Sequence, residues 1–208
     1  MKLFIDSATN YLYLAVVNDD NTKAYAFTRV GKNDHSETLT NYLDDFLKSH
    51  NIDVEAISQI YVGRGPGSYT GLRIAGTIGK VFAFIKNLPF YSFSSLDLIA
   101  SKHLDKNGKY KAIIKAKKNY SYLKAYTVNN KIIVDQDDTF ICDDELDKYA
   151  EYSPIMVDDN TFVDGDKMAL NILKYKMFKE EDKYNYVPNY LRSELSWLEN
   201  YKNKILVK

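Results

Sequence analysis

The stretch from Tyr61 to Lys86 constrains the fold more than any other part of the sequence. A short β-prone run, Ile60 to Val62, is followed directly by Gly63 to Gly67, where glycine and proline break regular structure. Ser68 or Thr70 can then cap a helix, because either side-chain oxygen can accept a bond from a free N–H of the first turn. The apolar residues that follow recur at helical spacings: they are Leu72, Ile74, Ile78, Phe82 and Ile85. This pattern predicts a strand, a glycine-rich turn and a helix.

The same predicted helix carries a strip of small residues spaced four apart: Gly71, Ala75, Gly79 and Ala83. Residues at this spacing lie almost above one another on a helix. Glycine in a helix interior costs about 1 kcal/mol relative to alanine, and Gly76 adds a second such cost beside Gly79. The strip therefore predicts close packing against a second element, either within the chain or across a subunit boundary.

The glycine-rich turn has two interpretations. It could present backbone N–H groups to a phosphate, or it could be only a tight connection. Familiar nucleotide and hydrolase motifs do not fit its spacing. The Walker pattern fails because Ile74 stands where its first glycine belongs before Gly79-Lys80, and the serine-hydrolase elbow fails because Pro66 and Thr70 flank Ser68. Spacing alone leaves both interpretations open.

Composition gives no global electrostatic case for a nucleic-acid or membrane partner. The chain has 208 residues, with 28 basic and 28 acidic side chains. Its single cysteine, Cys142, excludes an internal disulfide, and the acidic stretch around it favours an unreactive thiol. The three histidines have no spacing typical of a metal site, and no apolar run is long enough to span a membrane. We expect a soluble, cytoplasmic protein without a metal.

The predicted elements repeat once along the chain. Strands at 3–5, 11–17 and 22–30 form an antiparallel meander, followed by a helix that Asp34 and Glu37 could cap. After a boundary at Lys106 to Lys109, strands at 111–116, 120–128 and 131–134 form a second meander. Further elements are predicted as helices at 95–104, 143–152 and 167–178 and strands at 88–93 and 154–157. We predict two lobes, residues 1–106 and 107–208, with a ligand cleft between them.

The turn Asp6-Ser7-Ala8-Thr9 follows the first strand. In a two-lobed nucleotide-binding fold, an acidic residue here could hold a metal–phosphate group while the hydroxyls reach phosphate oxygens. The alternative, which the residues favour, is a local turn in which these side chains accept bonds from nearby backbone N–H groups.

Several segments together resemble the TsaB (YeaZ) family of tRNA threonylcarbamoyladenosine synthesis. The most specific is GRGPGSYTGLRIAGTIGK, the glycine-rich turn and its helix. The resemblance extends to the opening LFIDSATNYLYLAVV, to His35-Ser36-Glu37 before a helix, to PFYSFSSLDLIA and to PNYLR at 188–192. It is strongest over residues 1–104, while the second half matches mainly in the order of its elements.

The resemblance implies an α/β fold of the actin-like ATPase, sugar kinase and Hsp70 type, with mixed sheets flanked by helices and a reduced second lobe. It also implies a non-catalytic subunit. Such a subunit supports a TsaD-like catalytic partner, which installs N6-threonylcarbamoyl on adenosine 37 of tRNA. A TsaE-like ATPase joins that pair, tRNA is contacted indirectly, and a homodimer is a further expectation. The implied partner interface lies on the helices before and after the glycine-rich turn, through Leu39, Leu43, Gly71, Leu72, Ala75, Gly76, Gly79 and Ala83.

The resemblance implies no tightly bound cofactor; ATP or ADP, if bound, is expected at the subunit interface. The candidate nucleotide-binding residues are Asp6, Ser7, Thr9, Gly65, Gly67 and Ser68. One departure from the family pattern concerns Lys115, which stands where relatives place an aspartate, and a lysine cannot coordinate Mg²⁺.

Two other functions remain as alternatives. One is a divergent enzyme of the same fold, either an ATPase or kinase or a metallopeptidase. The other is a self-contained nucleic-acid-binding module, against which the neutral net charge argues. If the small-residue strip contacts a partner, replacing Ala75 or Gly79 with leucine should abolish pairing and leave the fold intact.

Overall fold

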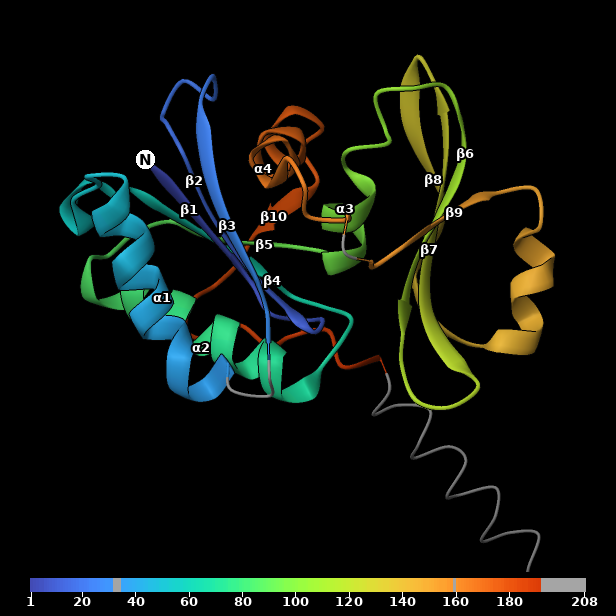
Figure 1. Ribbon diagram of the computed structural model, residues 1–208, viewed down its shortest axis with the longest axis horizontal. Helices are drawn as coiled ribbons and strands as arrows, with labels where there is room; N and C mark the ends of the chain where they lie inside the picture. The colour runs from blue at the N-terminus through green and yellow to red at the C-terminus, as the bar shows by residue number, and fades with distance from the viewer. Residues whose placement is uncertain (32–34, 159, 192–208) are drawn as a thin grey trace, which may run out of the picture.

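The structure is a computed structural model that describes residues 1–31, 35–158 and 160–191. Two β-sheets organise the described chain (Figure 1). The larger sheet has the strand order β10-β5-β4-β1-β2-β3 and the smaller one β8-β7-β6-β9. The strands of the larger sheet are β1 (Lys2–Asp6), β2 (Tyr11–Val17), β3 (Ala24–Val30), β4 (Gln59–Gly63), β5 (Phe90–Phe93) and β10 (Phe178–Glu180). Those of the smaller sheet are β6 (Gly108–Lys115), β7 (Tyr120–Asn129), β8 (Lys131–Cys142) and β9 (Ser153–Met156).

Both predicted meanders are confirmed. Strands β1, β2 and β3 pair antiparallel in sequence order, and so do β6, β7 and β8. Strands β4 and β5 then add to β1 in parallel, and β9 adds to β6 in parallel, so each sheet is mixed. The carboxyl ends of β1, β4 and β5 therefore lie at one edge of the larger sheet.

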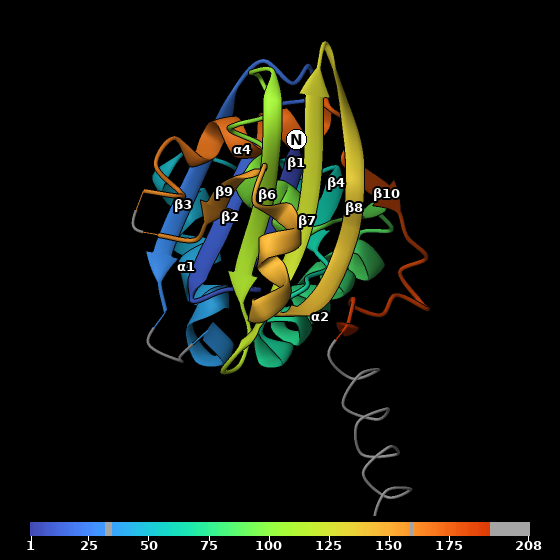
Figure 2. The same cartoon turned by 90° about the vertical axis from the view of Figure 1, so that its right-hand side faces the viewer.

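The helices form layers around and between the sheets. Helices α1 (His35–Ser49) and α2 (Tyr69–Ile85) cover one face of the larger sheet. Helices α3 (Ser95–Ala100) and α4 (Gly165–Lys174) lie between the two sheets (Figure 1). In Figure 2 the smaller sheet faces the viewer, and the larger sheet lies behind it. Two 3₁₀ segments complete the described elements, η1 (Val54–Ala56) and η2 (Asp143–Tyr149).

Strands β1 and β2 are buried on both faces, which explains why they read as continuous apolar runs. Leu3 and Ile5 of β1 point into the core beneath α1 and α2, while Phe4 points into the core between the sheets. This alternation follows from the two-residue period of a strand. Tyr13 of β2 also lies in the core between the sheets, and its hydroxyl donates a hydrogen bond to the Gly165 carbonyl oxygen of α4 (2.7 Å).

The predicted boundary between the lobes needs a correction. Residues 107–208 do not all belong to the second lobe, because β10 pairs with β5 of the larger sheet. Helix α4 likewise packs against β2 and β3. Among the described elements after α3, only β6 to β9 and η2 form the second sheet and its cover. The chain therefore leaves the first lobe after α3 and returns to it at α4.

Three further expectations differ from the structure. Strand β8 runs from Lys131 to Cys142 instead of ending at 134, with a register irregularity against β7. The segment expected as a helix at 143–152 is the 3₁₀ segment η2. The helix expected at 167–178 ends at Lys174, and Phe178 already begins β10. The cap predicted from Asp34 and Glu37, and Arg192 of the PNYLR segment, lie outside what the structure describes.

Candidate functional site

A cleft of about 960 Å³ separates the two lobes. Its first-lobe wall comes from the β1–β2 turn and the start of α2, and its second-lobe wall from β6 and the end of β9. Asn189 and Tyr190, from the segment after β10, also line it. None of its described lining residues is acidic, while Lys115 and Lys117 are basic. The cleft could therefore accept an anionic ligand.

Asp6 ends β1 but does not line this cleft. Its side chain is buried and accepts two hydrogen bonds, from Ser95 Oγ (2.5 Å) and from the Ala8 backbone N–H (2.7 Å). Burial raises the pKa of Asp6 to about 6, and the bonds from Ser95 and Ala8 partly oppose that rise. This is the local turn that the sequence favoured, with both carboxylate oxygens already bonded inside the chain.

The two hydroxyls of the same turn are also engaged within the chain. Ser7 is fully buried, and its Oγ donates to the Gly71 carbonyl oxygen of α2 (2.8 Å). Thr9 Oγ1 accepts a bond from the Tyr11 N–H (3.1 Å), although Thr9 still lines the cleft. The turn therefore fastens β1 to the first turn of α2.

The glycine-rich turn is built for close approach. A side chain at Gly67 would place its Cβ 2.1 Å from the Ala8 carbonyl oxygen, and Gly65 has a φ of +95°. Ser68 caps α2, because its Oγ accepts from the Gly71 N–H (3.2 Å). Of the six predicted nucleotide-binding residues, Thr9, Gly67 and Ser68 line the cleft, whereas Asp6, Ser7 and Gly65 do not.

The small-residue strip of α2 packs inside the chain. A Cβ at Gly79 would lie 2.3 Å from Val62 Cγ1 of β4, and one at Gly71 would lie 1.8 Å from the Ser7 carbonyl oxygen. Ala75 and Ala83 are fully buried in the core beneath α1 and α2. Of the two partners left open by the sequence, the second element is therefore the chain's own larger sheet.

The predicted partner interface accordingly needs a correction. Leu39, Leu43 and Leu72 are buried side chains of the monomer, and Gly76 faces Tyr186, whose Cε1 would lie 3.0 Å from an added Cβ. With the four residues of the strip, all eight predicted contact residues are buried within the described chain. A leucine at Gly79 would also disturb the fold, because the space it needs is occupied by Val62.

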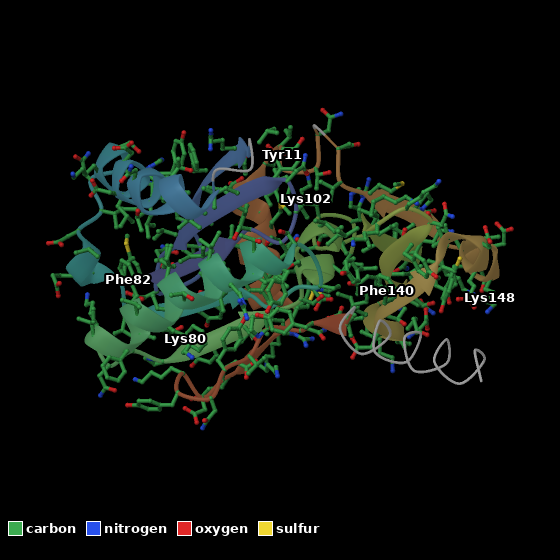
Figure 3. The ribbon with its side chains drawn as sticks, turned by 90° about the horizontal axis from the view of Figure 1, so that it is seen from below. Tyr11, Lys80, Phe82, Lys102, Phe140 and Lys148 are labelled. Carbon is green, nitrogen blue, oxygen red and sulfur yellow. The ribbon has the colours of Figure 1, made fainter. Side chains whose placement is uncertain are left out.

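The outer side of α2 is exposed and could contact a partner. Val81 and Ile85 lie four residues apart and are 49% and 75% exposed. Seen from below, α2 lies across the first lobe, and Lys80 and Phe82 are labelled along it (Figure 3). Next to it, α1 turns Asp44 and Lys48 to solvent. Side chains four residues apart are neighbours on a helix, so Val81 and Ile85 form a small exposed apolar surface together.

A group that sequence reasoning missed joins the two lobes. Asp97 of α3 and Lys124 of β7 form a buried ion pair (3.0 Å), and Asp138 of β8 pairs with Arg64 (3.3 Å). A signal was present, since Lys124 and Asp97 each interrupt an apolar run, YLKAY and LDL. A charge in a buried run needs a partner.

The described part of the chain contains no cluster of three or more histidine, cysteine, aspartate or glutamate side chains arranged to hold a metal ion. Lys115, which stands where an aspartate was expected, lies at the end of β6 and pairs with Asp143 (3.0 Å). None of the helices within the described ranges is long and apolar enough to cross a bilayer.

Comparisons with known proteins agree with this architecture. The model of the family described as TsaD, tRNA N6-adenosine threonylcarbamoyltransferase, matches residues 29–192. A tRNA threonylcarbamoyladenosine biosynthesis protein TsaB from Bacillus subtilis is 30% identical over 131 residues, which are 63% of this chain and 57% of that protein. The TsaB of Escherichia coli is 31% identical over 106 residues, 51% of this chain and 45% of that protein. The match thus spans about half the length of these relatives.

Solved structures support the fold. A crystal structure from Pseudomonas aeruginosa, described as an uncharacterized protein with similarity to peptidase YeaZ, superimposes with a TM-score of 0.74. The two chains are 18% identical, and the superposition covers 91% of this chain and 98% of that one. The mixed sheets with flanking helices are those of the actin-like ATPase fold. The chain therefore belongs to the family that the TsaD model describes, and the relatives named above that it matches within this family are TsaB (YeaZ) proteins.

Proposed function

We propose that this chain is a non-catalytic subunit in tRNA threonylcarbamoyladenosine biosynthesis, and that it binds a TsaD-like catalytic subunit through the outer side of α2 and the adjoining α1. The exposed pair Val81 and Ile85 on α2 carries the proposal. Burying a fully exposed side chain of this kind against a partner would contribute about 1.5–3 kcal/mol to the free energy of association. The contribution of Val81 and of Ile85 is smaller in proportion, because each is already partly buried.

A non-catalytic role is supported by the state of the β1–β2 turn. Asp6 and Ser7 would have to reach a phosphate or a metal, yet their oxygens are engaged by Ser95, Ala8 and Gly71. On the other wall of the cleft, Lys115 supplies a cation where Mg²⁺ would need an oxygen ligand.

The partner proposal is tested by mixing this chain with the TsaD-like protein of the same genome and recording native mass spectra. A one-to-one complex is expected with the wild-type chain, and Val81→Glu or Ile85→Glu should remove it. Val134→Glu on β8 is the matched control, because Val134 is 47% exposed but lies on the second sheet. A folded Val81→Glu protein that still pairs normally would refute the assignment of the surface.

The remaining partners are proposed on the family resemblance and the cleft. A TsaE-like ATPase would join the pair, tRNA would be contacted indirectly, and a homodimer would form when the catalytic partner is missing. ATP or ADP would bind in the cleft, where Lys115 and Lys117 can face its phosphates. A partner subunit would be needed to complete this site. The competing function, an ATPase, kinase or metallopeptidase, predicts turnover of ATP or of a peptide by the isolated chain. Measurable turnover that is lost in Asp6→Asn would favour this alternative.

A further inference from the structure

The contact between the two lobes is largely apolar. Leu96 of α3 packs in one core with Ile114 of β6 and Tyr122 of β7. Apolar burial stabilises such a contact but is non-directional, so it does not by itself fix the angle between two sheets. Hydrogen bonds and ion pairs are directional, so they can fix an angle that apolar burial leaves open.

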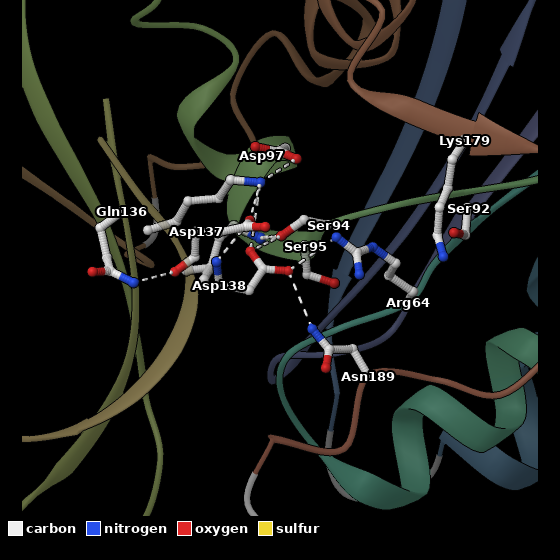
Figure 4. Close-up of polar contacts among 12 residues, drawn as sticks. Arg64, Ser92, Ser94, Ser95, Asp97, Gln136, Asp137, Asp138, Lys179 and Asn189 are labelled. Carbon is white, nitrogen blue, oxygen red and sulfur yellow. Dashed lines mark hydrogen bonds and ion pairs between the residues drawn. The ribbon is translucent and has the colours of Figure 1, made fainter. Parts of the chain in front are cut away.

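A polar network crosses the same contact and has this directional character (Figure 4). We call it the interlobe latch. Its first-lobe members are Arg64, Ser94, Asp97 and Asn189, and its second-lobe members are Lys124, Tyr126, Asp137 and Asp138.

Lys124 is the cationic centre of the interlobe latch. Its side chain is only 7% exposed, and Nζ lies 3.0 Å from Asp97 Oδ2 of the first lobe. On its own lobe, Nζ lies 3.1 Å from Asp137 Oδ1 and 3.7 Å from Asp138 Oδ1. The second oxygen of Asp97 accepts a bond from Tyr126 Oη (2.8 Å). Both oxygens of the buried Asp97 carboxylate are therefore bonded to the second lobe.

Asp138 is the anionic centre. Its side chain is 3% exposed and accepts from three separate parts of the first lobe. Ser94 Oγ, before α3, donates at 2.7 Å, Arg64, after β4, pairs at 3.3 Å, and Asn189 Nδ2, near the end of the described chain, donates at 3.3 Å. Asn189 is itself fixed by its N–H bond to the Arg64 carbonyl oxygen (2.7 Å). One carboxylate on β8 thus contacts three separate segments of the other lobe.

We infer that the interlobe latch holds the two lobes at one fixed angle, so that the width of the cleft is preset and the chain acts as a rigid body. Buried polar groups are costly unless their bonds are made, and here the bonds are made only at one relative placement of β7 and β8 against α3. A small rotation of the second sheet would separate Asp138 from its three donors together. The inference does not depend on the proposed partner function.

Distances between spin labels test the inference. In a Cys142→Ser background, labels at Lys23→Cys and Lys131→Cys report on the two lobes, because both sites are exposed and outside the interlobe latch. Double electron–electron resonance should give one narrow distance distribution. Lys124→Met should broaden it at least twofold. Lys115→Met is the matched control, since the ion pair of Lys115 with Asp143 has the same 3.0 Å length but lies within the second lobe. This control should leave the distance distribution unchanged.

A second variant covers the case in which Lys124→Met does not fold. Arg64→Met with Asn189→Ala removes two of the donors to Asp138 and leaves Lys124 and Asp97 paired. Broadening in either latch variant, without broadening in Lys115→Met, supports the inference. If every latch variant that folds keeps the wild-type distribution, the inference is overturned and apolar packing fixes the angle. Equal broadening in Lys115→Met would overturn it as well.

Discussion

Gly79→Ala tests how tightly α2 is seated on the larger sheet. The new methyl group would lie 2.3 Å from Val62 Cγ1 and 3.3 Å from both Ile60 Cγ2 and Phe90 Cε2. Val62 and Ile60 are fully buried on β4 and cannot turn toward solvent. Because Val62 is β-branched, its χ1 rotation is also restricted. The helix or the strand must shift to admit one carbon atom.

Two opposing effects determine the size of the change. Alanine is about 1 kcal/mol better than glycine in a helix interior. Overpacking of a well-filled core costs about 1–3 kcal/mol, and a 2.3 Å contact with a buried, stiff neighbour places this site near the upper end. The net destabilisation should be about 1–2 kcal/mol, which for a chain of this size lowers Tm by about 2–8 °C.

Thermal unfolding followed by circular dichroism measures this change. Thr77→Ala is the control, since Thr77 lies on the exposed side of α2 and gains helix propensity without entering the core. The control should match or exceed the wild-type Tm. If Gly79→Ala is as stable as Thr77→Ala, the strip does not need its glycine and the argument from close packing is wrong.

Three further predictions concern the two turns beside the cleft. Since the pKa of Asp6 is about 6 in the folded chain against 3.8 unfolded, its stabilising contribution is complete below about pH 4 and is lost as pH rises through 6. Urea unfolding should therefore show wild type losing up to about 3 kcal/mol relative to Asp6→Asn between pH 4 and 7, and parallel curves would contradict this. Ser95→Ala removes a bond to the carboxylate and should move the Asp6 pKa upward in a carboxyl ¹³C NMR titration; an unchanged value would discount that bond. Gly67→Ala should lower Tm, because its Cβ would meet the Ala8 carbonyl oxygen at 2.1 Å, and an unchanged Tm would mean that the turn can yield.

The local sequence pattern was sufficient to predict the strands and helices that surround the core beneath α1 and α2. The apolar run at 11–17 predicted β2, and within it Leu12, Leu14 and Val16 share one core face. The spacing from Leu72 to Ile85 predicted α2, with Ser68 or Thr70 as its cap, and Ser68 is the residue that caps it. Each of these signals extends over two or more structural periods, so that local sequence determines the element.

Other features depend on contacts between distant residues and left no such signal. Strand β10 has only three residues, too few to show a period, and it pairs with β5 across a long sequence separation. The small-residue strip identified a face of α2 but not what that face contacts. Deciding between the chain's own sheet and a partner required the position of Val62. Lys124 stands as a charge within an apolar run, which indicates that it needs a buried partner. The sequence does not identify this partner as Asp97, because the two residues lie on different elements.

The β1–β2 turn and the outer side of α2 are parts of one arrangement. In a nucleotide-binding lobe the turn after β1 must keep its oxygens free for a ligand, but here Ser7 Oγ donates to the Gly71 carbonyl oxygen and the Ser68 N–H donates to the Ala8 carbonyl oxygen (2.6 Å). Both bonds fasten the turn to the start of α2. The groups that would serve chemistry therefore position a helix whose opposite side exposes Val81 and Ile85. A mutation that freed this turn for a ligand would loosen the helix proposed to bind the partner, so the two functions compete for the same bonds.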